Sequence, residues 1–294
     1  MKALVLINEK SGTVLSTGAE NIEETIVREL RERSVTDPVI VTGDWRALVE
    51  AAQSTTFDVA ICAGGDGTQA AVAQALLGKD AALLPLPCGT VNLLCRDLGL
   101  SLDIEEALKA GLDGAPRRID AGLAGKRVFL NNIVFGAYAE LAEAREDLRD
   151  AESFDDLNFA LVSAANALFH ADPVEFDVHI GKRKVSLETN TLIVSNNAIT
   201  NVEKLIPRRD RLDDGALAVY LVSSQNGEEF TSVLGAFARG AIEDDERIDM
   251  RHCRACRVAS PSAKFSYTVD GDALERSEPL HVKCLPGALR VLSP

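Results

Sequence analysis

The sequence is short of basic residues and contains no long apolar run. Its 31 lysines and arginines are outnumbered by 45 aspartates and glutamates, which gives a formal net charge of −14 at pH 7. A nucleic-acid-binding protein gains much of its affinity by neutralising backbone phosphates, so this charge argues against such a partner. It also argues against simple electrostatic docking on an anionic membrane. No apolar stretch approaches the roughly 20 residues that a transmembrane helix needs.

Other signals of special architecture are missing too. The six cysteines have no framework spacing, which favours a reducing cytoplasm, and residues 1–7 are too short for the core of a signal peptide. There is no internal repeat and no low-complexity linker. What remains is an ordinary globular composition, 46% hydrophobic and 26% charged, in a chain of 294 residues that is long enough for two domains. We therefore expect a two-domain cytoplasmic protein.

The first 118 residues alternate between strand and helix patterns. Apolar strands are expected at 3–7, 39–41, 59–62 and 82–86. Helices are expected at 21–33, 45–53 and 69–77, and a further helix follows residue 92 and ends at residue 98. Regular alternation implies a parallel sheet covered by helices on both faces. Ligands of such sheets bind beyond the carboxyl ends of the strands, where the connecting loops gather. The pattern thus predicts a doubly wound α/β domain over residues 1–118.

Beyond residue 118, strand patterns dominate. Strands are expected at 118–120, 128–134, 174–180, 184–187, 191–195, 216–222, 254–259 and from 263 onward. This favours an antiparallel β-sandwich over 119–282, with helical inserts at 140–170 and 227–242 and with 283–294 returning to the first domain. The amphipathic segment 154–169 suits either core packing or a lipid-facing surface.

Three glycines surround one aspartate between the third strand and its helix, in Gly64-Gly65-Asp66-Gly67-Thr68. Glycines tolerate positive φ and let the backbone approach a ligand, and helix N-termini offer N–H groups to phosphate oxygens. The carboxylate of Asp66 would repel bare phosphate, so it requires a cation, a proton or a hydroxyl nearby. No lysine follows the glycines and G-x-G-x-x-G is absent, so this is neither a Walker loop nor a dinucleotide fingerprint. We interpret the loop as a phosphoryl-transfer site; a tight turn capped by Asp66 is the simpler alternative.

A second polar turn, Gly89-Thr90-Val91-Asn92, stands in the equivalent place after the fourth strand. Taken alone, it could be an ordinary turn in which Thr90 caps the next helix. Since both turns follow parallel strands, they are expected at the same edge of the sheet. Together they are more specific than either one.

These motifs resemble the diacylglycerol kinase catalytic family, which includes bacterial lipid kinases and the sphingosine and ceramide kinases. Further landmarks follow in the family's order: Ile119-Asp120-Ala121-Gly122, Phe129-Leu130-Asn131-Asn132, Leu212-Asp213-Asp214-Gly215-Ala216-Leu217 and Val269-Asp270-Gly271-Asp272. The first glycine loop is shared with the NAD kinases. The second loop, the Asp-Asp-Gly turn and the late Asp-Gly-Asp favour the lipid kinases.

The resemblance implies an NAD kinase-like α/β domain that binds ATP and a β-sandwich domain that presents the lipid. The ATP contacts would be Asn8, Ser11, Gly12, Thr42, Gly64, Gly65, Asp66, Gly67, Thr68, Thr90 and Asn92. Asp66 would act on the nucleotide's metal or the transferring phosphate, Asp272 would take the hydroxyl proton, and Arg96 and Asp120 would surround the active centre. A structural Mg²⁺ would bind the Asp214 carboxylate and the carbonyls of Arg211 and Ala216.

Several positions depart from the family pattern. Ala70 and Ala71 replace its usual Asn-Glu pair, Leu93 replaces a carboxylate in the second loop, and Asp272 is shorter than the family's glutamate. By itself, Asp270-Gly271-Asp272 would be interpreted as a hairpin turn. A CxxC at residues 253–256, with Cys284 downstream, could hold zinc, although alternating strand residues explain it better.

The sequence therefore predicts an ATP- and Mg²⁺-dependent kinase acting on a hydroxyl of diacylglycerol or of a sphingoid or ceramide-like lipid. The expected partner is a lipid at a membrane surface, with peripheral membrane contact and with edge strands that could pair two copies of the chain. Two alternatives stay open. One is a soluble NAD kinase-like phosphotransferase, and the other is a nucleotide- or lipid-binding protein without catalysis, for which Ala70, Ala71 and Leu93 argue.

Overall fold

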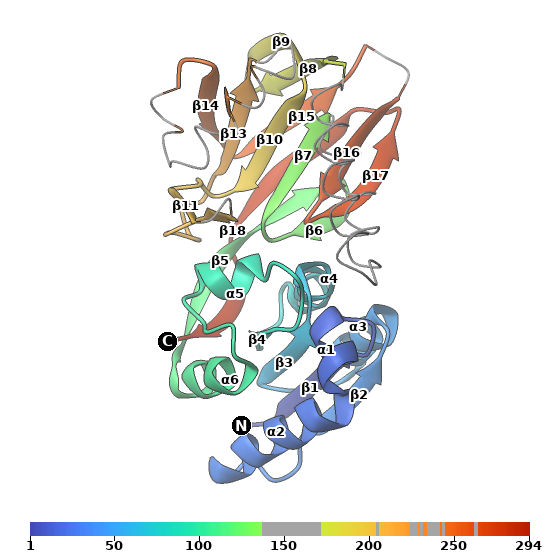
Figure 1. The fold of residues 1–294 in the computed structure, drawn as a ribbon, viewed down its shortest axis with the longest axis vertical. Helices are drawn as coiled ribbons and strands as arrows, with labels where there is room; N and C mark the ends of the chain where they lie inside the picture. Colours follow the sequence, from blue (N-terminus) through green and yellow to red (C-terminus); the bar gives the residue numbers. More distant parts are fainter. Residues whose placement is uncertain are drawn as a thin grey trace, which may run out of the picture. The chain divides into compact units, whose positions relative to one another are not determined.

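The protein is described here from a computed structural model, which covers residues 1–136, 172–203, 206–223, 229, 232–233, 242, 245–261 and 264–294. These residues form two compact units, whose elements are labelled in Figure 1. Unit 1 comprises Met1–Ala121, Arg211–Asp213 and Leu285–Pro294, and unit 2 comprises Gly122–Asp210 and Asp214–Cys284. The predicted insert 140–170, with its amphipathic segment 154–169, lies outside the described residues. The insert 227–242 is described only at residues 229, 232, 233 and 242.

Unit 1 is built on a parallel sheet in the order β2-β1-β3-β4-β18. Its strands are β1 (Ala3–Asn8), β2 (Val39–Gly43), β3 (Val59–Gly64), β4 (Ala82–Pro87) and the end of β18 (Leu280–Ser293). Apart from Asn8, every residue of β1, β3 and β4 is apolar or small. All three strands are buried along their length. Strands buried on both faces are typical of parallel sheets.

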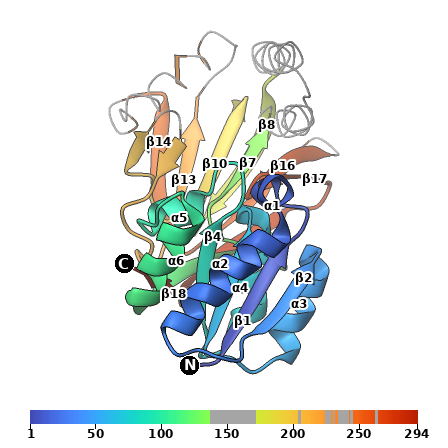
Figure 2. The ribbon, with the colours of Figure 1, turned by 60° about the horizontal axis from the view of Figure 1, so that its bottom comes forward.

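Helices cover both faces of this sheet. They are α1 (Gly12–Thr17), α2 (Ala19–Glu32), α3 (Trp45–Ser54), α4 (Asp66–Leu76), α5 (Leu93–Asp97) and α6 (Ile104–Asp113). Helices α3 and α4 pack together and contact β1, β2, β3 and β4, whereas α2 packs with α6 (Figure 2). The predicted doubly wound α/β fold is confirmed.

The start of α2 differs from the prediction. The helix predicted at 21–33 begins at Ala19, after Gly18, which has φ +90°. The Asn21 amide donates to the carbonyl of Thr17, at the end of the short helix α1 (2.7 Å). The sequence did not reveal α1, because six residues are too few to show a helical period.

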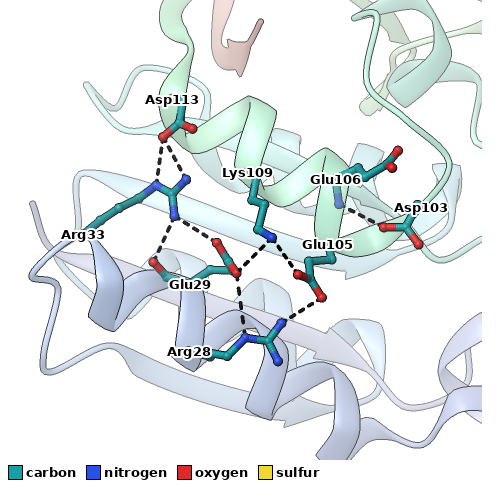
Figure 3. A network of polar contacts seen from close by, with 8 residues as sticks. All are labelled: Arg28, Glu29, Arg33, Asp103, Glu105, Glu106, Lys109 and Asp113. Atoms are coloured by element: carbon teal, nitrogen blue, oxygen red, sulfur yellow. Dashed lines mark hydrogen bonds and ion pairs between the residues drawn. The ribbon is translucent and has the colours of Figure 1, made fainter.

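A buried carboxylate ties α2 to α6 (Figure 3). Glu29 is 1% exposed, and it pairs with Arg33 one turn later on α2 (3.0 Å) and with Lys109 of α6 (3.6 Å). Lys109 also pairs with Glu105 (2.6 Å), and Glu105 forms a second ion pair with Arg28 of α2 (2.8 Å). Because a buried charge needs partners, this network fixes the packing of the two helices on their face of the sheet.

Unit 2 is an antiparallel sandwich, as predicted. One sheet has the order β14-β13-β10-β7-β16-β17, and the other contains β15, β8, β9, β6, the end of β5 and the beginning of β18. The bounds are β5 (Ala115–Ala124), β6 (Arg127–Phe129), β7 (Asn132–Gly136), β8 (Val174–Ile180), β9 (Arg183–Thr189), β10 (Thr191–Asn196), β13 (Leu217–Val222), β14 (Ile248–Cys253), β15 (Ala255–Ala259), β16 (Phe265–Val269) and β17 (Asp272–Arg276). A separate hairpin joins β11 (Asn201–Glu203) to β12 (Ile206–Arg208).

Aromatic rings fill the space between the two sheets of unit 2. Phe135 of β7 packs edge-to-face on Phe176 of β8 (5.9 Å between centroids) and stacks on Tyr267 of β16 (5.7 Å). Phe265 contacts Phe176 edge-to-face at 6.0 Å. Such pairs add to the free energy gained by burying the rings, so this cluster holds the sandwich together.

The strand predicted at 128–134 is in fact two strands, β6 and β7, separated by Leu130 and Asn131. The Asp270 carboxylate accepts N–H groups of this turn, and the buried Arg209 guanidinium donates to the carbonyl of Leu130 (2.5 Å) and the side chain of Asn131 (2.8 Å). Apolar flanking residues conceal such a break, because the partners lie far along the chain.

In the part of the chain that is described, no helix is long and apolar enough to cross a membrane.

Candidate functional site

Three loops of unit 1 meet at the carboxyl ends of β1, β3 and β4. Asn8, the last residue of β1, donates to the hydroxyl of Thr68 in the glycine loop (2.7 Å). Ser11 accepts the backbone N–H of Gly65 (3.3 Å), and Thr13 donates its backbone N–H to the carbonyl of Cys88 (3.3 Å). The first loop is therefore joined to both of the others.

The glycines of these loops serve close packing. A Cβ atom on Gly89 would lie 2.6 Å from the Cα of Gly65, and one on Gly64 would lie 2.7 Å from the side chain of Thr68. Gly64, Gly65 and Gly89 all have negative φ. Their requirement for glycine is thus steric, because the two loops touch backbone to backbone.

Asp66 links the glycine loop to the second loop. It is the first residue of α4, where a carboxylate is favoured by the positive end of the helix. Its Oδ1 accepts the backbone N–H of Leu94, near the start of α5, at 3.2 Å. Asp66 therefore bonds to the neighbouring helix, which differs from the simple alternative of a cap on its own helix.

The second loop is closed by its own asparagine. Asn92 is buried and adopts the left-handed conformation (φ +57°); its Oδ1 accepts the N–H of Gly89 (2.7 Å) and its Nδ2 donates to the Gly89 carbonyl (2.8 Å). Arg96 of α5 donates to the carbonyl of Val91 (2.8 Å). The simpler alternative, in which Thr90 caps α5, does not hold, because the N-cap is Asn92 and Thr90 is exposed on the loop.

One buried residue under these loops was missed. Gln69 of α4 is fully buried, and its Nε2 donates to the carbonyls of Gly64 (2.9 Å) and Leu86 (3.0 Å), with Cys95 Sγ at 3.7 Å. The available signal was a lone amide side chain at the start of an alanine-rich helix. Without knowledge of its neighbours, that residue looks like any polar helix position.

The other residues expected to contact ATP lie around the same loops. Gly12 begins α1 and Gly67 is the second residue of α4. Thr42 is exposed on β2 and pairs in register with Ile7 of β1, one residue before Asn8. The structure thus places these predicted residues at or beside the carboxyl edge of the unit 1 sheet.

Asp120 is also buried in unit 1. It is 1% exposed on β5; its Oδ1 accepts the N–H of Gly287 (2.8 Å), and its own N–H donates to the carbonyl of Leu212 (2.7 Å). These contacts join β5 to β18 and to the residues that precede the Asp-Asp-Gly turn. Asp120 therefore has a clear structural role, and its expected part in the chemistry stays a prediction.

The Asp270-Gly271-Asp272 segment is a hairpin turn within unit 2. Asp270 (φ +50°) and Gly271 (φ +92°) occupy the turn between β16 and β17, as in a type I′ hairpin, and Val269 pairs with Asp272. The side chain of Asp272 is 57% exposed and forms an ion pair with Arg127. The Asp270 carboxylate accepts three backbone N–H groups, from Leu130, Asn131 and Asn132.

The proposed Mg²⁺ turn is shaped by Asn197. This buried residue has φ +72°; its side chain accepts the N–H of Asp214 (2.9 Å), and its own N–H donates to the carbonyl of Ala216 (3.3 Å). The Arg211 guanidinium pairs with Asp213 (3.4 Å). One carboxylate with main-chain carbonyls is an all-oxygen donor set, which fits the chemistry of a hard cation.

The CxxC lies at the junction of β14 and β15 in unit 2. A hydrogen bond with Cys256 holds the pKa of the Cys253 thiol below its ordinary value, and the same contact raises the pKa of Cys256. Among the residues described, no group of three or more His, Cys, Asp or Glu side chains could hold a metal ion. Cys253 is the last residue of β14 and Cys256 is the second residue of β15, which agrees with the strand interpretation.

Comparison with known proteins matches both units. The diacylglycerol kinase catalytic domain matches residues 2–124, and the YegS C-terminal NAD kinase beta sandwich-like domain matches residues 131–293. "Probable lipid kinase YegS-like" from Pseudomonas aeruginosa (strain UCBPP-PA14) is 29% identical over 300 residues, which cover 99% of this chain and 93% of that protein. "Diacylglycerol kinase" from Staphylococcus saprophyticus is 27% identical over 234 residues, covering 77% of this chain and 74% of that protein.

Solved structures share the fold. A diacylglycerol kinase from Bacillus anthracis str. Sterne superposes with a TM-score of 0.72 at 19% identity, covering 100% of this chain and 97% of that one. Yeast NADH kinase complexed with NADH gives a TM-score of 0.52 at 10% identity, covering 100% and 84%. The predicted NAD kinase-like fold with a β-sandwich is confirmed. Since the two domain matches span nearly the whole sequence in the order that the motifs indicated, the chain belongs to the diacylglycerol kinase catalytic family and is a lipid kinase.

Proposed function

We propose that this lipid kinase transfers the γ-phosphoryl group of ATP to a hydroxyl of diacylglycerol or of a sphingoid or ceramide-like lipid. The observation that carries the proposal is the assembly of three loops at one edge of the unit 1 sheet. Asn8, Ser11, Gly65, Thr68 and Gly89 are held together there by hydrogen bonds and by glycine packing. Backbone N–H groups at the start of α4 suit phosphate oxygens.

The residues fit a division of labour for phosphoryl transfer. That reaction needs charge neutralisation, an aligned hydroxyl and an acceptor for one proton. We assign the first task to Asp66, which would bind the nucleotide's metal, and the last to Asp272, with Arg96 and Asp120 near the reacting groups. Asp272 is exposed, so a hydroxyl could reach its carboxylate.

Mg²⁺ is the cation that we propose for the turn shaped by Asn197. The Asp214 carboxylate and the carbonyls of Arg211 and Ala216 would hold it, and its contribution would be to stabilise the turn by charge. The carbonyl of Ala216 already accepts one N–H, and a carbonyl oxygen has a second lone pair for a cation. Equilibrium dialysis with Mn²⁺ as a probe, on the wild type and on Asp214→Ala, tests this assignment.

The transfer reaction is tested by incubating the purified protein with labelled ATP, Mg²⁺ and a panel of lipids in mixed micelles. We expect label in one lipid class and a loss of transfer in Asp66→Asn. If the folded protein labels no lipid of the panel, the proposed substrate class is wrong. If Asp66→Asn retains activity, the role given to Asp66 is wrong.

A nucleotide acceptor such as NAD is the second candidate, since the fold is also that of yeast NADH kinase. Label transfer to NAD in buffer without detergent would favour it. ATP binding by calorimetry, without transfer to any acceptor, would instead favour a non-catalytic protein. Vesicle flotation tests the proposed peripheral membrane contact, and sedimentation equilibrium tests the proposed homodimer.

A further inference from the structure

The last residue pair between β3 and β4 contains a proline. Gly64 pairs in register with Pro87, and proline has no N–H to give to the neighbouring strand. The next N–H along β4, that of Cys88, turns back to the carbonyl of Leu86 (2.8 Å). Pro87 gives no N–H to β3 and the Cys88 N–H is used within its own strand, so a side chain that donates to carbonyls of both strands adds a cross-link where the glycine loop and the second loop begin.

Gln69 supplies such a cross-link. Its Nε2 carries two hydrogens, and it lies within hydrogen-bond distance of both Gly64 O and Leu86 O, at 2.9 and 3.0 Å. The opposite orientation of the amide would place its oxygen against two carbonyl oxygens, so the neighbours determine which way it points. Gln69 is fully buried, and its Oε1 has no hydrogen-bond partner. An amide accepted at that cost must gain its stability from the two carbonyls.

The two carbonyls that Gln69 joins stand directly before the loops of the site. Gly64 precedes Gly65 and Asp66, and Leu86 lies three residues before Gly89. The loops themselves touch where Gly65 meets Gly89. A change of a few tenths of an ångström in the strand spacing would therefore separate or force together the backbones of the two loops.

From this geometry we infer that Gln69 is a positioning residue, which sets the spacing of the glycine loop and the second loop and thereby the affinity for the phosphates of ATP. This inference rests on the proposed function for its ligand, since ATP is the molecule that the loops are proposed to bind. Gln69 itself does not touch the nucleotide. It acts through the backbone of residues 64–68 and 86–92.

The test compares Gln69→Met, which keeps length but has no donor, with Gln69→Glu, which keeps one donor when its buried carboxyl is neutral. Gln74→Met, an exposed glutamine on the same helix, is the matched control. We expect the KM for ATP to rise about tenfold or more in Gln69→Met, less in Gln69→Glu and not at all in the control. The KM for the lipid should be unchanged in all three.

Hydrogen exchange without nucleotide provides a second readout. Gln69→Met should speed the exchange of amides in 64–68 and 88–94, with no change in the strands of unit 2. A uniform increase in exchange with an unchanged KM for ATP would mean that Gln69 only stabilises the fold, and this would overturn the inference. If the wild type itself binds no ATP, the proposed function fails, and local exchange at the two loops alone decides the role of Gln69: unchanged exchange in Gln69→Met refutes it.

Discussion

The two aspartates of the β16–β17 turn should separate stability from catalysis. Asp270 accepts the N–H groups of Leu130 (2.8 Å), Asn131 (2.9 Å) and Asn132 (3.1 Å), and these bonds hold the break between β6 and β7. Asp272, two residues later, is exposed and pairs with Arg127. We predict that Asp270→Ala destabilises unit 2, whereas Asp272→Asn leaves its stability almost unchanged but removes kinase activity.

The magnitude follows from the contacts. A hydrogen bond to a charged acceptor contributes about 1.5–3 kcal/mol, but three bonds to one partly exposed carboxylate are not additive, so we expect Asp270→Ala to lose about 3–4 kcal/mol. Asp270→Asn should lose about 1–2 kcal/mol, because Oδ1 can still accept two N–H groups and asparagine also tolerates positive φ. Breaking an exposed pair such as Asp272 with Arg127 costs about 0–1 kcal/mol.

Urea unfolding followed by circular dichroism measures the stability, and label transfer to lipid measures the activity. Loss of a general base lowers kcat by about 10²–10⁴-fold, so Asp272→Asn should fall in that range. Glu275→Gln removes another exposed carboxylate from β17 and serves as the control, with activity unchanged. Full activity in Asp272→Asn would refute the base assignment. Wild-type stability in Asp270→Ala would refute the structural role of the three hydrogen bonds.

Three further predictions concern other parts of the chain. Gly89→Ala would bring a Cβ within 2.6 Å of the Gly65 backbone, so it should lower the free energy of unfolding by about 1–3 kcal/mol. Thermal unfolding measures this loss, and calorimetry should show weaker ATP binding. Glu29→Gln removes the buried charge between α2 and α6, so thermal unfolding should show a free energy of unfolding that is lower by about 2 kcal/mol. Cys253, whose pKa is lowered by its hydrogen bond with Cys256, should be alkylated first by iodoacetamide at pH 8, since burial raises the pKa of Cys88 to about 12. Mass spectrometry that finds Cys88 modified first would contradict the last prediction.

The first four strands and their alternation with helices could be predicted because each of these strands carries its own signal. Fully apolar runs such as β3 and β4 identify a parallel sheet, and the change to short alternating strands after residue 118 identifies the sandwich. The polar turns after β3 and β4 were placed correctly at one edge of the sheet, because parallel strands bring their carboxyl ends together. These inferences need only local sequence and one topological rule.

Features that depend on distant partners could not be predicted. The break between β6 and β7 is held by Asp270, about 140 residues away, and by Arg209. The cap of α5 is decided by the left-handed conformation of Asn92 and by its bonds to Gly89, which a propensity for Thr90 does not reveal. The role of Gln69 depends on two carbonyls at the ends of adjacent strands. In each case a polar side chain finds its partner only after the fold has formed.

The departures in the two loops make Asp66 the deciding residue. Residues 64–71 and 88–94 contain no other carboxylate, because alanines stand at 70 and 71 and Leu93 stands in the second loop. Any cation on the nucleotide would therefore depend on Asp66 alone among these loop residues. Its Oδ1 also accepts the N–H of Leu94, and the amide oxygen of an asparagine can accept the same N–H. Asp66→Asn thus removes the charge while it preserves the contact between the loops, so a loss of transfer in this folded variant would be due to charge and would argue against a protein without catalysis.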